Sequence, residues 1–299
     1  DGIENWSKIM MPIIIVLLLV LAVRGLTLPG GIDGLKFLFL PRFDELTASA
    51  IVLALGHSFF TLSLGMGTMI TYGSYLNKKQ NLLNSALWVI ALDTAIALLA
   101  GTAIFTSVFA AGADPDGGPG LIFYILPSIF PQLAYGAIWG TLFFTLLFMA
   151  ALTSAISILE VVTAYFIDQK GWSRNRATIQ FGAIITVVGV FCSFSMGGGI
   201  NIAEYFGSSF QHYLGETFFD VMDNLSSKYM LPFGGMMTAI FILVRWGVPS
   251  FLSEFGGENL DSEKNRLIVT IFCFIAAGVA GFILLNELIE TITGNAIIG

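Results

Sequence analysis

The chain has 299 residues, of which 56% are hydrophobic and 11% are charged, and its formal net charge is −7. Soluble domains carry roughly 25% charged residues, so the composition excludes an ordinary soluble protein and predicts an integral membrane protein. The charges are spread over loops and helix ends without a polybasic run, and nucleic acid is not expected as a partner. The two isolated cysteines, Cys192 and Cys273, predict neither a disulfide framework nor a metal site.

Long apolar runs predict an all-α polytopic membrane protein. A helix needs about 20 apolar residues to cross the bilayer core, and this rule predicts seven spans in a single transmembrane domain: 9–28, 46–76, 83–111, 135–168, 177–194, 218–246 and 267–288. The segment 112–134 contains four prolines, which exclude one continuous helix. Its apolar residues favour a loop folded into a vestibule over one left in water.

The distribution of Lys and Arg predicts the orientation of the spans, since cytoplasmic loops carry the excess of these residues. One side carries Lys8, Lys78, Lys79, Lys170, Arg174, Arg176, Arg245, Lys264 and Arg266, whereas the other carries Arg24, Lys36 and Arg42. Lys228 lies within a predicted span. We therefore expect a multi-pass protein of the plasma (inner) membrane, with the N-terminus cytoplasmic and the C-terminus and loop 112–134 extracellular or periplasmic.

The second predicted span contains "GHSFFTLSLGMGTMITYGSYL", in which Ser63, Gly65 and Gly67 interrupt the helix at mid-membrane depth. Irregular backbone at that depth is tolerated only where it lines a cavity or is buried in protein. One interpretation is a binding site made by the free backbone groups of a discontinuous helix. The other is that small residues merely allow close helix packing. These residues alone support both interpretations equally.

Two further spans carry polar groups at similar depth. Asp93 lies among apolar residues of the third span, and an intramembrane carboxylate usually faces a cavity, a partner or an ion. Thr153 and Ser154 are adjacent hydroxyls in the fourth span, one turn after Ala150, although such hydroxyls commonly bond back to their own helix. Hard cations prefer oxygen ligands, so this combination suits an alkali cation beside a small polar solute.

The sequence resembles the bacterial neurotransmitter:sodium symporters, which are amino-acid transporters with the leucine-transporter fold. In that fold, broken helices supply free backbone groups for substrate and ions. The segments that carry the resemblance, in matching order along nearly the whole chain, are "VRGLTLPG", "FFTLSLGMGTMITYGSYL", "LDTAIALLAGTAIF", "ALTSAISILEVVTAYFID" and "FFDVMDNLSSKYMLPFGG".

The resemblance implies that the seven spans correspond to helices five to eleven of the family. Helices one to four, which include another broken helix, would then be missing partners of this chain. The chain starts without an initiator Met, almost at once inside a helix. We therefore expect the C-terminal two-thirds of a symporter, which supplies only half of each of two sodium sites and does not transport alone; a homodimer is one possible assembly.

The resemblance also assigns candidate sodium ligands. Thr61 and Asp93 would belong to one site, and Ala150, Thr153 and Ser154 to the other. Chloride-dependent relatives have a neutral residue where this chain has Asp93, with a Ser and a Gln nearby where this chain has Ala97 and His57. Because Asp93 supplies a negative charge, the resemblance predicts transport that does not require chloride.

Substrate and gate residues follow from the same resemblance. The substrate would contact the broken helix and the fourth span through Phe60, Thr61, Ser63, Leu64, Gly65, Met66, Ser154 and Ile158. Ser63 and the unwound backbone would face the amino and carboxylate groups, whereas Phe60, Met66 and Ile158 would line the side-chain pocket. Asp223 would be the outer-gate carboxylate and Asp168 the inner one, with Tyr75 supporting the inner gate.

Some residues and rival functions remain open from the sequence. Glu160 suits a protonatable or water-solvating role and a satisfied carboxyl equally well, and His57 is more readily explained as a hydrogen-bonded residue at a helix start than as a proton carrier. A haem protein or intramembrane enzyme using His57 and His212 is disfavoured because His212 falls in a predicted outer loop. Two rivals stay open: a truncated or split, non-transporting half of a symporter, and a proton-coupled transporter of the same fold.

Overall fold

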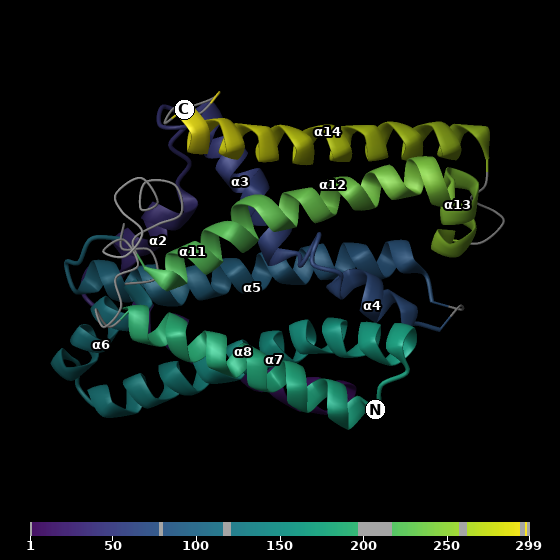
Figure 1. Ribbon diagram of the computed structural model, residues 1–299. Coiled ribbons are helices and arrows are strands. Elements are labelled where there is room, and N and C mark those ends of the chain that lie inside the picture. Colours follow the sequence, from purple (N-terminus) through teal and green to yellow (C-terminus); the bar gives the residue numbers. More distant parts are fainter. Residues whose placement is uncertain are drawn as a thin grey trace. The chain divides into compact units, whose positions relative to one another are not determined.

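The computed structural model describes residues 2–77, 80–115, 121–196, 217–256, 262–293 and 297, and the regular elements of these residues are all helices (Figure 1). The all-α class predicted from the sequence is therefore confirmed. Several residues used in the sequence predictions, namely Lys78, Lys79, Pro119 and His212, lie outside the described residues.

Six helical segments in the described residues are long and apolar enough to cross a membrane. Five of them are single helices: α1 (Gly2–Leu26), α5 (Leu82–Ala110), α7 (Gly136–Lys170), α8 (Arg174–Met196) and α14 (Glu263–Thr293). The sixth, Phe218–Trp246, is a composite. The predicted span 46–76 is instead divided into α3 (Ala48–Thr61) and α4 (Thr68–Ser74), as the interruption at Ser63, Gly65 and Gly67 predicts.

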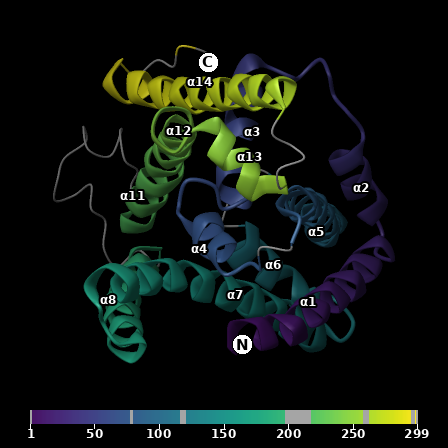
Figure 2. The same ribbon diagram turned by 90° about the vertical axis from the view of Figure 1, so that its right-hand side faces the viewer.

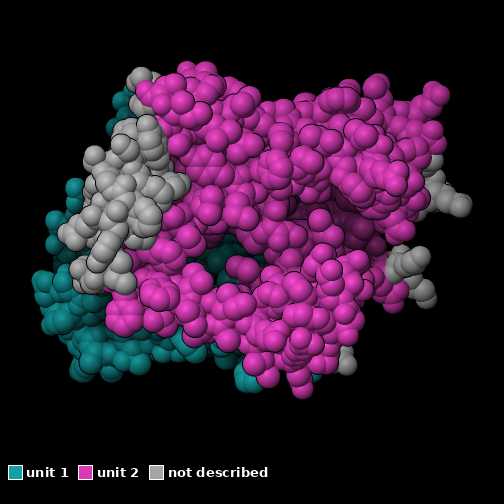
Figure 3. Space-filling model, in the orientation of Figure 1, with its two compact units in different colours: residues 1–45, 90–157 teal, residues 46–89, 158–299 magenta. Residues whose placement is uncertain are grey.

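The described chain divides into two compact units (Figure 3). The first comprises residues 1–45 and 90–157, and it contains α1, α2 (Gly31–Phe39), most of α5 and the first part of α7. Its core joins Leu18 of α1 to Val108 of α5 and Phe143 of α7. Gly34 allows α2 to approach α5 closely, since a Cβ at this position would lie 2.3 Å from the carbonyl oxygen of Phe105.

The Pro-rich segment of this first unit is more regular than the sequence predicts. Residues 121–132 form three consecutive helical turns, η1 (Leu121–Ile125), α6 (Leu126–Ile129) and η2 (Phe130–Gln132). Pro127 and Pro131 each lie in the first turn of an element, where the missing N–H has no helical partner to lose. The prolines therefore divide the helix without abolishing it, and Leu126 and Ile129 are buried.

The second unit comprises residues 46–89 and 158–299. Within it, α12 (Leu231–Phe241) and α14 lie side by side (Figures 1 and 2). The composite span begins with α11 (Phe218–Asn224) and contains two π-helical segments, η3 (Leu225–Met230) and η4 (Ile242–Trp246), before α13 (Val248–Gly256). Pro232 is the second residue of α12 and has no N–H to offer the preceding turn, which gives a local reason for the altered winding.

Candidate functional site

The break between α3 and α4 is made by three residues in the left-handed conformation. Ser63 has φ 54°, Gly65 φ 79° and Gly67 φ 83°. The amides of Ser63 and Leu64 donate to the carbonyls of Phe60 (3.0 Å) and Phe59 (2.8 Å), which is the hydrogen-bond pattern of a Schellman C-cap. Such caps normally use Gly, and for a residue with a side chain this conformation costs about 1–2 kcal/mol. The backbone at Ser63 is thus strained.

The backbone around the break is left without its usual helical partners. Within the described residues, the amides of 65–70 donate no backbone hydrogen bond, and the carbonyls of 62–66 accept none. The first regular bond of the second half-helix runs from the amide of Thr71 to the carbonyl of Gly67 (2.9 Å). Backbone groups of this kind need partners at membrane depth. Apart from the Gly65 carbonyl, which Gly234 of α12 covers, they are therefore available to bind a polar solute or a cation.

Close packing contributes to the break as well. A Cβ on Gly65 would lie 2.2 Å from the carbonyl oxygen of Leu231, and a Cβ on Gly234 would lie 2.1 Å from the carbonyl oxygen of Gly65. Gly67 is less crowded, because a Cβ added there would meet only the Val161 side chain, at 3.1 Å. The packing interpretation therefore applies to Gly65, whereas the free backbone groups fit the binding interpretation.

The predicted sodium and substrate ligands are distributed over both units. The residues of the break and Ile158 belong to the second unit, whereas Asp93, Ala150, Thr153 and Ser154 belong to the first. The complete sites therefore remain predictions. Phe60, Ser154 and Ile158 are exposed, and Thr61 and Asp93 are partly buried and each has an interaction partner.

The second predicted sodium site has a local arrangement in α7. The hydroxyl of Thr153 donates to the carbonyl of Ala150 at 2.8 Å, which is the back-bond to its own helix considered from the sequence. This bond consumes the hydroxyl proton. The oxygen lone pairs of Thr153 remain, and a carbonyl oxygen has a second lone pair. Both groups can therefore still act as cation ligands.

Glu160 is the centre of a polar cluster in the second unit. Its side chain is only 6% exposed, and it forms a bidentate pair with Arg174, in which Nη1 donates to Oε2 at 2.8 Å and Nη2 to Oε1 at 3.0 Å. The Tyr75 hydroxyl donates to Oε1 at 2.7 Å. Of the two interpretations left open by the sequence, the structure therefore supports the satisfied carboxyl. Tyr75, predicted to support the inner gate, bonds to Glu160.

Arg174 was not predicted as part of a site, because it lies beyond the end of α7. Gly171, with φ 64°, ends α7 and turns the chain back. Trp172 then packs on Phe166 and Phe181, and these contacts fix the hairpin from which Arg174 returns to Glu160. Asp168 is exposed and forms no ion pair with another described residue.

The gate candidate Asp223 and the open candidate His57 are both exposed on helices. Asp223 is exposed near the end of α11, where its backbone carbonyl accepts the hydroxyls of Ser226 (3.1 Å) and Ser227 (2.6 Å). His57 is exposed in the third turn of α3, which begins at Ala48. The expectation that His57 stands at a helix start is therefore wrong, because α3 begins nine residues earlier, at Ala48, close to the start of the predicted span at residue 46.

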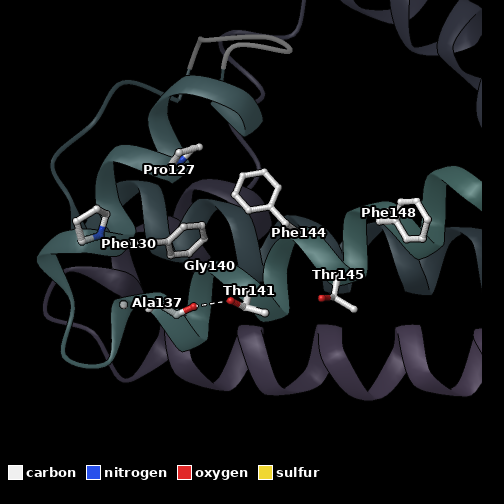
Figure 4. A pocket seen from close by; sticks show the side chains of 10 residues that line it. Pro127, Phe130, Ala137, Gly140, Thr141, Phe144, Thr145 and Phe148 are labelled. Carbon is white, nitrogen blue, oxygen red and sulfur yellow. Dashed lines mark hydrogen bonds between the residues drawn. The ribbon is translucent and has the colours of Figure 1, made fainter. Parts of the chain in front are cut away.

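A groove of about 820 Å³ lies in the first unit between the turns at 121–132 and one face of α7 (Figure 4). Phe130, Phe144 and Phe148 contribute aromatic surface. The hydroxyl of Thr141 donates to the carbonyl of Ala137 at 2.8 Å and is thereby satisfied. The Thr145 hydroxyl is the other side-chain polar group on its wall. The groove is mostly apolar, and it lacks the convergent polar groups of a site for a charged solute.

Comparison with known proteins places these features in a family. The family described as "Sodium:neurotransmitter symporter family" matches residues 1–295. The chain is 38% identical over 259 residues to the uncharacterized sodium-dependent transporter YhdH of Bacillus subtilis, covering 86% of this chain and 55% of that protein. It is 35% identical over 274 residues to an uncharacterized sodium-dependent transporter of Haemophilus influenzae, covering 91% and 56%. The chain therefore belongs to the sodium:neurotransmitter symporter family.

A solved structure supports the same fold. The crystal structure of MhsT in complex with L-phenylalanine matches with a TM-score of 0.79 and 43% identity, covering 95% of this chain and 63% of that chain. The leucine-transporter-type fold predicted from the resemblance is therefore confirmed, and the family is one of transporters, not enzymes. The chain spans little more than half the length of the two curated relatives.

Proposed function

We propose that this chain supplies the substrate-binding break and part of two sodium sites of a sodium-coupled amino-acid symporter that works by alternating access. The observation that carries the proposal is the run of amides at 65–70 in the break that donate no backbone hydrogen bond within the described residues. The structurally similar MhsT was crystallised in complex with L-phenylalanine, which supports an amino acid as the substrate class. The lipid bilayer is the expected environment, with the N-terminus of the chain cytoplasmic and its C-terminus outside.

In this proposal the sodium ions are bound by oxygen ligands. Thr61 and Asp93 contribute to one site, and Ala150, Thr153 and Ser154 to the other; further helices beyond those of this chain complete both. The Asp93 carboxylate balances the charge of one sodium ion, so chloride is not required. Moving each positive charge inward is favoured by roughly 2.3 kcal/mol per 100 mV of membrane potential.

The substrate would lie against the break. Ser63 and the free amides would hold its carboxylate, while the exposed Phe60 and Ile158 side chains, with Met66, would line the apolar part of the pocket. Sodium beside the substrate carboxylate couples the two binding events, and this coupling is reciprocal: substrate raises the sodium affinity by the factor by which sodium raises the substrate affinity.

Two regions would control access. Asp223 would act at the outer gate and Asp168 at the inner gate. The Tyr75–Glu160–Arg174 cluster would hold α4, the second half of the broken helix, against the end of α7 and the start of α8. Because this cluster is internal to the second unit, α4 would move together with the end of α7.

The proposal is tested by uptake of a pool of labelled amino acids into proteoliposomes under three gradients: sodium, potassium and proton. We expect no uptake by the chain alone. When it is co-expressed with the N-terminal half of a relative, we expect uptake under the sodium gradient only, unchanged when gluconate replaces chloride. Uptake driven by the proton gradient without sodium would establish a proton-coupled transporter instead. Absence of both uptake and equilibrium binding, even with the N-terminal half present, would support a non-transporting half instead.

A further inference from the structure

Lys228 is a charged residue inside a membrane-spanning helix that neither the sodium sites nor the gates explain. Its ammonium lies 3.6 Å from a carboxylate oxygen of Glu287 on α14. The Lys228 side chain is 45% exposed, whereas that of Glu287 is only 16% exposed. A carboxylate with so little exposure in a membrane span is costly unless it is paired. Lys228 and Glu287 therefore form a specific contact between η3 and α14.

The next residue makes a second contact with the same face of α14. The hydroxyls of Tyr229 and Thr291 are hydrogen-bonded to each other. Thr291 gives its proton to the carbonyl of Glu287 (2.7 Å), so the Tyr229 hydroxyl is the donor in the bond between them. Glu287 and Thr291 are one helical turn apart. Two consecutive residues of η3 are thus fixed to two stacked residues of α14.

The segment held in this way begins two residues after Asp223, which is the next-to-last residue of α11. Its π-helical winding is uncommon, and π-helical turns frequently occur at functional sites. Lys228 comes five residues after Asp223, which is the hydrogen-bonding repeat of a π-helix; in an α-helix the same spacing would rotate the two residues apart by about 140°. The hydroxyls of Ser226 and Ser227, both in η3, donate to the backbone carbonyl of Asp223. The backbone at Asp223 is therefore joined to η3 by two hydrogen bonds.

We propose that Lys228 is a positioning residue for the gate: paired with Glu287, and with Tyr229 bonded to Thr291, it clamps η3 to α14 and so fixes the carboxylate of Asp223. This inference rests on the proposed function in one respect, the role of Asp223 as the outer gate. The clamp itself is a property of η3 and α14, and it can be measured without transport.

The test measures the reactivity of a single cysteine in η3. Leu225, which is exposed, is replaced by Cys in a background in which Cys192 and Cys273 are Ala, and its labelling rate with a membrane-impermeant maleimide is followed. We expect Lys228→Met and Glu287→Gln to change the labelling rate about tenfold, the ratio that corresponds to about 1.4 kcal/mol. Lys228→Arg, and the exchanged pair Lys228→Glu with Glu287→Lys, should restore the rate toward that of the unaltered background.

Glu290→Gln is the matched control, since Glu290 is an exposed carboxylate on the same helix, three residues beyond Glu287. Equal labelling rates in Lys228→Met and Glu290→Gln would overturn the proposal, as would an exchanged pair whose labelling rate stays at that of the single variants. In uptake assays, Lys228→Met should raise the half-saturating substrate concentration with the maximal rate retained, and Glu290→Gln should not. A labelling change in a protein that shows no sodium-driven uptake would support the clamp and count against the proposed function instead.

Discussion

Gly65 in the break and Gly234 in α12 meet backbone to backbone: a Cβ on Gly234 would lie 2.1 Å from the carbonyl oxygen of Gly65. The contact places the irregular backbone against protein, as a membrane span requires. It also explains why "PFGG" in α12 accompanies "LGMG" in the broken helix, because neither side of this contact has room for a Cβ.

Replacing Gly65 by Ala should destabilise the protein by roughly 3 kcal/mol or more, because the substitution combines a left-handed backbone with a clash against the Leu231 carbonyl. Gly73→Ala in α4 is the control, since a Cβ there meets no atom within 4 Å. Thermal unfolding in detergent measures the difference. Similar unfolding temperatures for the two variants would show that the tight contact does not exist.

Replacing Glu160 by Gln should weaken the cluster around it. Breaking a buried ion pair commonly costs about 3–5 kcal/mol, but the Arg174 side chain is 57% exposed, so we expect a loss of about 1–3 kcal/mol of stability.

Tyr75→Phe should cost about 1 kcal/mol of stability, the contribution of one hydrogen bond. A double-mutant cycle with Glu160→Gln and Arg174→Ala should give a coupling energy that is also about 1–3 kcal/mol. Asp168→Asn on the same helix should leave stability unchanged, and equal effects of Glu160→Gln and Asp168→Asn would contradict the account.

Replacing Asp93 by Asn should make transport depend on chloride. The neutral side chain leaves one sodium ion without its balancing charge, and an anion from solution would have to replace it. We expect sodium-driven uptake by this variant to fall at least about tenfold in gluconate relative to chloride. Asp33→Asn, which removes an exposed carboxylate paired with Lys36 at 2.8 Å, serves as the control. Chloride-independent uptake by Asp93→Asn would remove Asp93 from the sodium site.

Thr153 and Thr141 form a natural pair for comparison. Both lie on α7, and each hydroxyl donates to a carbonyl of its own helix at 2.8 Å. Only Thr153 is a proposed sodium ligand. Thr153→Val should therefore raise the half-saturating sodium concentration about tenfold, whereas Thr141→Val should not. If sodium titrations of the two variants coincide, Thr153 has only the structural role of a helix back-bond.

The sequence predicted the features that arise from local chemistry. Ser63, Gly65 and Gly67 predicted the break because left-handed backbone and missing helical bonds follow directly from such residues, and the apolar runs predicted the all-α class. The partners of Glu160 and Lys228 were not predicted. Arg174 reaches Glu160 only after the turn at Gly171, and Glu287 is 59 positions from Lys228, so both pairs depend on tertiary packing that no local pattern encodes. The position of Lys228 inside a span was the available signal for the second pair.

The most direct measurement of the central claim is hydrogen exchange at the break, followed by mass spectrometry on the purified protein. The amides of 65–70 have no backbone acceptor within the described residues, so they should exchange rapidly in potassium. Addition of sodium together with the amino acid identified in the uptake screen should slow their exchange, whereas peptides from the middle of α14 should be unaffected. Exchange at 65–70 that is the same with and without sodium and amino acid would contradict the claim that the broken backbone is the binding site.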